Sequence, residues 1–398
     1  MLLMKNLKKK YVQEDYKMPG SKVASFEELL NSVSVKEIKS TILKPYENIL
    51  KNLDNVYIFG IKELGKRVFH YCQKKGIKVA GFVDNNKENH NKTLFDTKIF
   101  AIEELLSSKQ NVTIIIASTL YLYEILTRLE NFGFKNLLPA QILSVYDEES
   151  FFYEPAQDGV FDDLIENKAA YLDVYNKLAD EKSKMIMENI VKFRTNFDFK
   201  LFHEAFEQSG KAYFYDEIIK LSDEEVFVDG GGFDGDTVLH FVEKTSNKFK
   251  KIYFFEPDKN SFPLALKNLK NYQNIEYFQK GLYSDFDTLR FCETGLEGSC
   301  ISSDGNIEIE VVPLDSVAKE NATFIKLDVE GSEEEALKGA KNHIKNSPKI
   351  AVCVYHKCND LRKIPELILS LNFNYNLYLR HHTNSLYETV IYAIPKEK

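Results

Sequence analysis

The feature that most constrains the fold is a glycine-rich turn that follows a short apolar run. Residues 226–229 read Val-Phe-Val-Asp, and an apolar pattern at helical spacing occupies residues 238–242. Four glycines lie between them: Gly230, Gly231, Gly232 and Gly235. A strand, a tight turn and a helix start predict a unit in which backbone N–H groups can approach a bound nucleoside.

The next apolar run, residues 252–255, ends in Glu256, an acid placed to accept hydrogen bonds from two ribose hydroxyls. Counted from Gly231, the dinucleotide motif G-x-G-x-x-G would have its middle glycine where Phe233 stands, and Asp234 and Asp236 would repel a diphosphate. S-adenosylmethionine carries a sulfonium and an ammonium but no phosphate. We therefore interpret the segment as a site for this nucleoside, with a purely structural turn as the alternative.

Length and composition limit the possible classes of protein. The chain has 398 residues, of which 44% are hydrophobic and 28% charged, and this suggests two or three globular domains. A net charge of −8 argues against a nucleic-acid partner. Five cysteines without metal-ligand spacing fit a reducing compartment. Because no apolar run approaches the roughly 20 residues of a membrane span and no signal peptide is evident, we expect a cytoplasmic chain without membrane insertion.

Strand and helix patterns alternate in two separate parts of the chain. We predict an N-terminal tail with helices (1–54), a Rossmann-like unit (55–144), a helical connector rich in Tyr and Phe (145–222) and a second α/β unit (223–398). In the last unit, residues 288–291 and 307–312 break the alternation and predict an added β-hairpin. In the polar loop between them, residues 293–306, the stretch 298–303 could line a substrate mouth or be disordered surface.

The first α/β unit has its own glycine turn, from Gly60 to Gly65, and an acid, Asp84, at the end of its second strand. Lys62 occupies the middle glycine position, so a pyrophosphate could approach only if this lysine paired with it. The unit resembles the small Rossmann-like domain that precedes bacterial sugar-modifying enzymes, including sugar O- and N-acyltransferases. A nucleotide or nucleotide-sugar site and a scaffold without a ligand are both open.

A second charged strand end lies further along the chain. Residues 322–333 place Lys326, Asp328 and Glu330 at period two, so that their side chains are expected on one face of a strand. At the carboxyl edge of a parallel sheet these groups would face the glycine turn. Asp328 or Glu330 could remove a proton or bind a cation, and Lys326 could keep them ionised or pair with a substrate acid. His356, after the apolar run 350–355, is a third candidate base. An ion-paired strand end is the structural alternative.

Together these motifs resemble the FkbM family of S-adenosylmethionine-dependent O-methyltransferases. The matching stretches are residues 227–237, 255–257, 312–315, 325–333, 337–340 and 354–356. The resemblance implies a class I methyltransferase fold and methyl transfer to a hydroxyl of a sugar, glycan or other small molecule. By position, Asp229, Gly230, Gly231, Gly232, Gly235 and Asp236 would shape the cofactor pocket, and Glu256 would bind the ribose. The family often has Ala-Asn where this chain has Gly232-Phe233.

Methyl transfer to oxygen needs alignment of the two reactants and removal of a proton from a weak nucleophile. A divalent cation is compatible with the carboxylates, but no spacing indicates one, and nothing indicates an oligomeric state. Two other functions stay open: an NAD-dependent or sugar-nucleotide-modifying enzyme that uses the Gly60 turn, and a non-catalytic binding protein with a methyltransferase-like fold.

Overall fold

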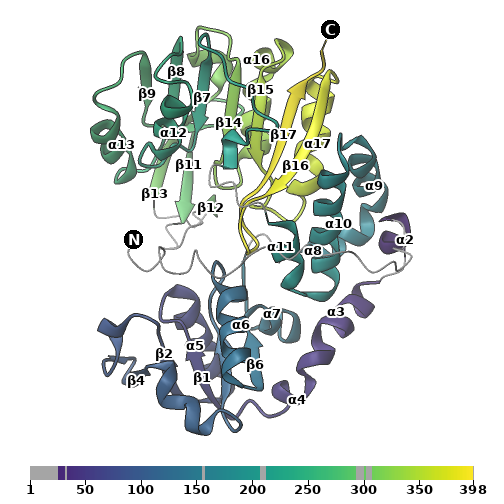
Figure 1. The fold of residues 1–398 in the computed structure, drawn as a ribbon, viewed down its shortest axis with the longest axis vertical. Coiled ribbons are helices and arrows are strands. Elements are labelled where there is room, and N and C mark those ends of the chain that lie inside the picture. Colours follow the sequence, from purple (N-terminus) through teal and green to yellow (C-terminus); the bar gives the residue numbers. More distant parts are fainter. Residues whose placement is uncertain are drawn as a thin grey trace.

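A computed structural model describes residues 26–31, 34–154, 157–206, 212–292, 300–301 and 307–397. Within them the chain forms two α/β units, one above the other in Figure 1, with a group of helices along one side. The α/β class predicted from the sequence is confirmed. The first 25 residues and most of the polar loop at 293–306 lie outside the described part.

The N-terminal unit is built on a six-stranded sheet of order β3-β4-β2-β1-β5-β6, in which only the β3–β4 pairing is antiparallel. Its strands are β1 (Asn55–Phe59), β2 (Lys78–Val83), β3 (Thr93–Leu94), β4 (Thr97–Phe100), β5 (Thr113–Ile116) and β6 (Asn136–Pro139). Its helices are α5 (Glu63–Lys75), η2 (Lys87–Asn89), η3 (Ile102–Ser108) and α6 (Leu122–Phe132). All four residues of β5 are buried, as expected of a strand covered on both faces.

The connector is helical, as predicted, and the helices before β1 pack with it. Its members are α7 (Gln141–Tyr146), α8 (Val160–Glu166), α9 (Lys168–Lys177), α10 (Glu181–Asn196), α11 (Lys200–Ala205) and η5 (Ala212–Phe214). The earlier helices are α2 (Phe26–Asn31), α3 (Val35–Leu43), η1 (Lys44–Tyr46) and α4 (Glu47–Leu50). The ring of Phe26 stacks on Tyr175 of α9 at 4.3 Å. Asp180, which caps α10, pairs with Arg380 at 2.7 Å and so ties the connector to the C-terminal sheet.

The C-terminal sheet has seven strands in the order β16-β17-β15-β14-β7-β8-β9, and only β17 runs antiparallel to its neighbours. Its strands are β7 (Val226–Gly230), β8 (Lys251–Phe255), β9 (Ile275–Phe278), β14 (Phe324–Leu327), β15 (Lys349–Cys353), β16 (Tyr375–His381) and β17 (Thr389–Pro395). Its helices are α12 (Asp236–Lys244), α13 (Ser261–Leu269), α14 (Leu314–Val317), α15 (Glu333–Lys338), α16 (Lys341–Lys345) and α17 (Asp360–Leu371).

Both faces of this sheet are buried, which explains why its strands read as continuous apolar runs. In β7, Val226 and Val228 pack into one hydrophobic cluster and Phe227 into another on the opposite face. The strand order reverses between β7 and β14. In sheets of this kind ligands bind outside the carboxyl ends of the strands at that reversal.

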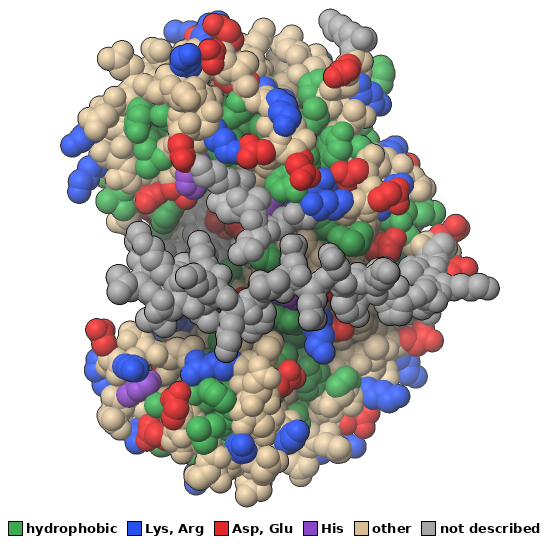
Figure 2. All heavy atoms as spheres, viewed as in Figure 1, with side chains coloured by type: hydrophobic (Ala, Val, Ile, Leu, Met, Phe, Trp, Pro, Cys, Tyr) green, Lys and Arg blue, Asp and Glu red, His purple; other side chains and the backbone are tan. Residues whose placement is uncertain are grey.

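The predicted hairpin is present: β11 (Asp287–Cys292) pairs antiparallel with β13 (Ile307–Val312). The short strands β10 (Gly281–Leu282) and β12 (Cys300–Ile301) complete a separate four-stranded sheet. Helices of the described residues are all too short or too polar to span a membrane. On the face shown in Figure 2, the described basic and acidic side chains are interspersed over both units.

The carboxyl edges of the two main sheets face each other. Helix α6, which follows β5 in the N-terminal unit, stacks Tyr123 on His203 of α11 at 4.8 Å. Its Glu124 accepts a hydrogen bond from Asn384 in the loop between β16 and β17. That loop leads into β17 beside the carboxyl end of β15 (Figure 1). The N-terminal unit is therefore fixed close to the carboxyl edge of the C-terminal sheet.

Candidate functional site

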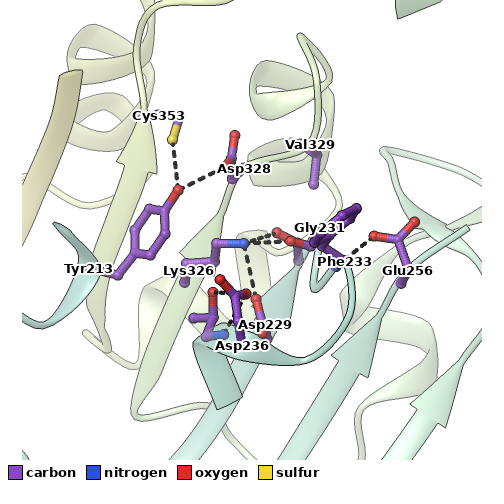
Figure 3. Close-up of polar contacts among 12 residues, drawn as sticks. Tyr213, Asp229, Gly231, Phe233, Asp236, Glu256, Lys326, Asp328, Val329 and Cys353 are labelled. Carbon is purple, nitrogen blue, oxygen red and sulfur yellow. Dashed lines mark hydrogen bonds and ion pairs between the residues drawn. The ribbon is translucent and has the colours of Figure 1, made fainter. Parts of the chain in front are cut away.

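Lys326 lies beneath the glycine turn. It is paired with Asp229 across the β7–β14 ladder, and its Nζ is 3.1 Å from the Asp229 carboxylate, with both side chains buried. The same ammonium donates to the carbonyl oxygens of Gly230 at 3.1 Å and Gly231 at 2.6 Å (Figure 3). Lys326 thus anchors the turn from below, away from the rim where it could pair with a substrate acid.

The charge of Lys326 is maintained by its neighbours. Burial lowers the pKa of this ammonium, but Asp229 and Asp328 outweigh burial and raise it. In return, Lys326 and His356 hold the pKa of Asp328 below its ordinary value against the effect of burial. Asp328 is therefore an ionised carboxylate at the end of β14.

The glycines let the turn approach β14 closely. Gly231 has a φ of 76°, and a Cβ on it would lie 1.8 Å from the carbonyl oxygen of Asp328. A Cβ on Gly232 would lie 2.1 Å from the ring of Phe254. Gly235, with a φ of 89°, is the N-cap residue of α12. These contacts are a structural reason for the glycines, in addition to any ligand. Asp236, the first residue of α12, accepts a hydrogen bond from the backbone N–H of Thr237 at 2.7 Å.

Glu256 lies where the sequence predicted, directly after β8 and beside the turn (Figure 3). Its two carboxylate oxygens accept backbone N–H groups of Phe233 at 2.8 Å and Asp258 at 2.7 Å. Burial raises its pKa, and these two hydrogen bonds oppose the rise. A carboxylate offers about four acceptor positions, so two remain for ribose hydroxyls. Phe233 has a φ of 49° and is 60% exposed at the tip of the turn.

The period-two arrangement predicted for Lys326, Asp328 and Glu330 ends early. Strand β14 stops at Leu327, and Glu330 has a left-handed φ of 53°. This turn still brings both acids to one imidazole. His356 Nε2 is 3.4 Å from an Asp328 oxygen and 3.6 Å from a Glu330 oxygen.

Glu333 also belongs to the site, although the sequence motif at residues 325–333, which contains it, did not single it out. Its Oε1 lies 2.9 Å from His356 Nδ1 and accepts the backbone N–H of Val329. Burial lowers the pKa of His356, but Glu333, Asp328 and Glu330 raise it to about 10. Burial also raises the pKa of Glu330 to about 7, which His356 only partly opposes. The imidazole is therefore held as a cation among carboxylates.

Two tyrosines complete the surroundings of Asp328. Tyr213 donates to its Oδ2 at 2.7 Å and contacts Cys353 Sγ at 3.4 Å, while Tyr355 donates to its Oδ1 at 3.4 Å. Burial and Asp328 raise the pKa of Glu388, in the β16–β17 loop, to about 7. Tyr355 precedes His356 after a strand, which could have indicated it. Tyr213 comes from the connector, where an aromatic residue indicated only packing.

In the N-terminal unit, the space around the glycine turn from Gly60 to Gly65 is filled by backbone atoms of the same unit. A Cβ on Gly60 would lie 2.5 Å from the carbonyl oxygen of Ala117, and one on Gly65 would lie 2.1 Å from that of Gly60. Asp84 accepts the backbone N–H of Asn86 at 2.8 Å and the amide of Asn89 at 3.0 Å. The acid expected to bind ribose therefore has a local structural role.

Two protein-family models match the chain. Residues 229–376 match the methyltransferase FkbM domain, and residues 52–137 match the model described as C2185-like, N-terminal. A search of curated proteins found no match.

Among solved structures, methyltransferase FkbM from Methylobacillus flagellatus KT is similar over 93% of this chain and 98% of its own, with a TM-score of 0.74 and 22% identity. That similarity shows the fold, including both α/β units and the connector. An rRNA methylase from Streptococcus thermophilus aligns with 51% of this chain and 96% of its own, with a TM-score of 0.31 and 13% identity.

Proposed function

We propose that this chain, whose residues 229–376 match the methyltransferase FkbM domain, is an S-adenosylmethionine-dependent O-methyltransferase whose acceptor is a hydroxyl of a sugar, glycan or sugar nucleotide. The observation that carries the proposal is the position of Glu256 at the carboxyl end of β8, beside a glycine turn anchored by Lys326. In the proposal this carboxylate accepts the ribose hydroxyls, and it lies next to the point where the strand order reverses, which is where sheets of this kind bind ligands.

The charge of the site supports the choice of cofactor. Asp229, Glu256, Asp328 and Glu330 surround the turn and the adjoining strand end. Such a site disfavours a diphosphate, whereas the sulfonium and ammonium of S-adenosylmethionine would be attracted to it. Gly230, Gly231, Gly232, Gly235 and Asp236 form the wall of this pocket in the proposal.

For the chemistry, the acceptor oxygen attacks the methyl carbon in line with the C–S bond, which breaks to leave S-adenosylhomocysteine. The hydroxyl proton must pass to a base. Asp328 and Glu330 are the candidates, and the Glu330 side chain is the more exposed, at 41% against 22%. His356, already protonated between carboxylates, serves better to orient them than to accept that proton.

The N-terminal unit fits a role in presenting the acceptor, because its carboxyl edge faces the β16–β17 loop beside the site. An acceptor with a sugar at one end and a larger group at the other would span the two edges. The structural use of Asp84 speaks against the alternative of an NAD site in this unit.

Calorimetry with S-adenosylhomocysteine tests the proposal. We expect micromolar binding to the wild type and a loss of at least about 1 kcal/mol in Glu256→Ala, because the ribose hydroxyls lose a charged acceptor. Glu276→Ala is the control, since Glu276 pairs with Lys251 on the next strand and has no role in the proposed site. Binding of NAD with no response to S-adenosylhomocysteine would reject the proposal.

A further inference from the structure

The cluster around His356 contains more negative than positive charge. The two ring nitrogens of His356 lie within 3.6 Å of carboxylate oxygens from three residues, Asp328, Glu330 and Glu333. Among the described residues, the other buried cation here is Lys326, which pairs with Asp229. Asp328 and the buried Glu333 share the one imidazolium of His356, and a buried carboxylate without a full counter-charge is unfavourable, so this arrangement favours an additional positive charge.

One buried polar atom in the same cluster lacks a hydrogen-bond partner. Glu333 is only 1% exposed, yet its Oε2 has no partner among the described residues. Its other oxygen, Oε1, lies 2.9 Å from His356 Nδ1 and accepts the backbone N–H of Val329. Because buried polar atoms nearly always have a partner, the unpartnered Oε2 indicates a group that binds there.

One ligand atom from each of Asp328, Glu333 and His356 can be chosen so that all lie within 4.8 Å of one another. Ligand atoms about 2.1 Å from one ion lie roughly 3 to 4 Å apart, so small side-chain movements suffice. We propose that Asp328, Glu333 and His356 form a binding site for one divalent cation.

The donor set indicates the class of cation. One imidazole nitrogen with two carboxylate oxygens suits Mn²⁺, Fe²⁺ or Zn²⁺ better than Mg²⁺ or Ca²⁺, which prefer oxygen ligands alone. Glu330, exposed beside the same imidazole, stays available to the acceptor.

A role for the cation in the reaction rests on the proposed function, whereas its binding does not. Three protein ligands leave positions open, where a hydroxyl oxygen could bind and become more acidic. The cation would then lie between the strand end and the acceptor, which is also where methyl transfer requires the proton to leave.

The test is titration of the chelator-treated full chain with MnCl₂, with free Mn²⁺ followed by electron paramagnetic resonance. We expect one Mn²⁺ per wild-type chain, little displacement by a tenfold excess of Mg²⁺, and at least tenfold weaker binding in Glu333→Gln and His356→Gln. Glu334→Gln is the matched control, because this neighbour in α15 pairs with Lys338 instead. Its Mn²⁺ affinity should equal that of the wild type.

Absence of Mn²⁺ uptake, or equal uptake by all variants, would overturn the metal site. Circular dichroism of each variant without metal shows whether weaker Mn²⁺ binding comes from the lost ligand or from unfolding. If a variant is unfolded, Asp328→Asn is used in its place. Calorimetry with S-adenosylhomocysteine on the same chelated protein separates the two proposals. Nucleoside binding without Mn²⁺ uptake removes only the metal site, and Mn²⁺ uptake without nucleoside binding removes only the methyltransferase proposal.

Discussion

Lys326 and Asp229 are register partners on adjacent parallel strands, and their buried side chains form an ion pair of 3.1 Å directly below the glycine turn. Lys326 also holds two carbonyl oxygens of that turn. The proposed cofactor pocket and the core of the sheet therefore share one buried cation, so replacing Lys326 should weaken both stability and ligand binding.

We expect Lys326→Met to lower the free energy of unfolding by about 3–5 kcal/mol, because it leaves the Asp229 carboxylate buried without a partner. Adding Asp229→Asn should recover a substantial part of that loss, since the orphaned charge is removed as well. Urea denaturation of the wild type, both single variants and the double variant gives the coupling energy. Additive losses in the double variant would contradict the pairing.

Gly231→Ala should destabilise the protein by more than backbone strain alone. The added Cβ would lie 1.8 Å from the Asp328 carbonyl oxygen in a residue whose φ is 76°. Gly76→Ala is a matched control, because Gly76 has a φ of 71° with open space around its Cβ position. We expect about 1–2 kcal/mol of strain in the control and a further 1–3 kcal/mol in Gly231→Ala.

The two glycine variants also separate strain from function. Gly231→Ala should abolish binding of S-adenosylhomocysteine in calorimetry, since the turn must move away from β14, whereas Gly76→Ala should bind it normally. Equal stability of the two variants in urea would contradict the expected additional loss in Gly231→Ala, because it would show that the turn at Gly231 can shift without a cost in free energy.

Phe233 adopts a left-handed conformation that suits asparagine or glycine better than an aromatic residue. We expect Phe233→Asn to raise the stability by about 0.5–1 kcal/mol in thermal unfolding, because its ring is largely exposed and little packing is lost. Phe373→Asn is the control, since Phe373 is exposed without a left-handed φ, and should change stability by less than about 0.5 kcal/mol. A lower melting temperature of Phe233→Asn than of the control would contradict this expectation, because it would mean that the Phe233 ring makes packing contacts that stabilise the fold.

The sequence predicted the parts of the site that are local in the chain. The turn at Gly231, the acid at Glu256 and the charged end of β14 each follow an apolar strand, and strand ends of a parallel sheet meet at one edge. The β11–β13 hairpin was visible for a similar reason, because two alternating runs interrupt the strand–helix order.

The contacts that depend on three-dimensional packing were not predictable from the sequence. Tyr213 reaches Asp328 from a connector element 115 positions earlier in the chain, and no spacing rule relates the two. The sequence left open whether Lys326 keeps the acids ionised or pairs with a substrate acid. The register with Asp229 directs its side chain under the turn, where it lowers the pKa of Asp328, which favours the first role. Glu330 departs from the period-two pattern because the chain turns left-handed immediately after β14.

His381 gives a prediction of how stability depends on pH. Its side chain is buried in β16, and Nδ1 lies 2.8 Å from the Thr389 hydroxyl. Burial, with a smaller contribution from His382, lowers the pKa of His381 to about 3. Between that value and the ordinary pKa of about 6.5, the unfolded chain binds a proton that the folded chain does not. This histidine therefore contributes full stability above pH 6.5 and loses it as the pH falls.

Between pH 6.5 and 5.5 we expect His381 alone to remove about 1 kcal/mol from the free energy of unfolding, because the unfolded imidazole is already half protonated at pH 6.5. Urea denaturation of the wild type and His381→Asn at both pH values isolates this contribution, because the carboxylates titrate alike in both proteins. The loss on acidification should be smaller in His381→Asn by about that amount, and unchanged in the exposed control His70→Asn. Identical pH dependence in the wild type and His381→Asn would mean that the imidazole is protonated within the fold.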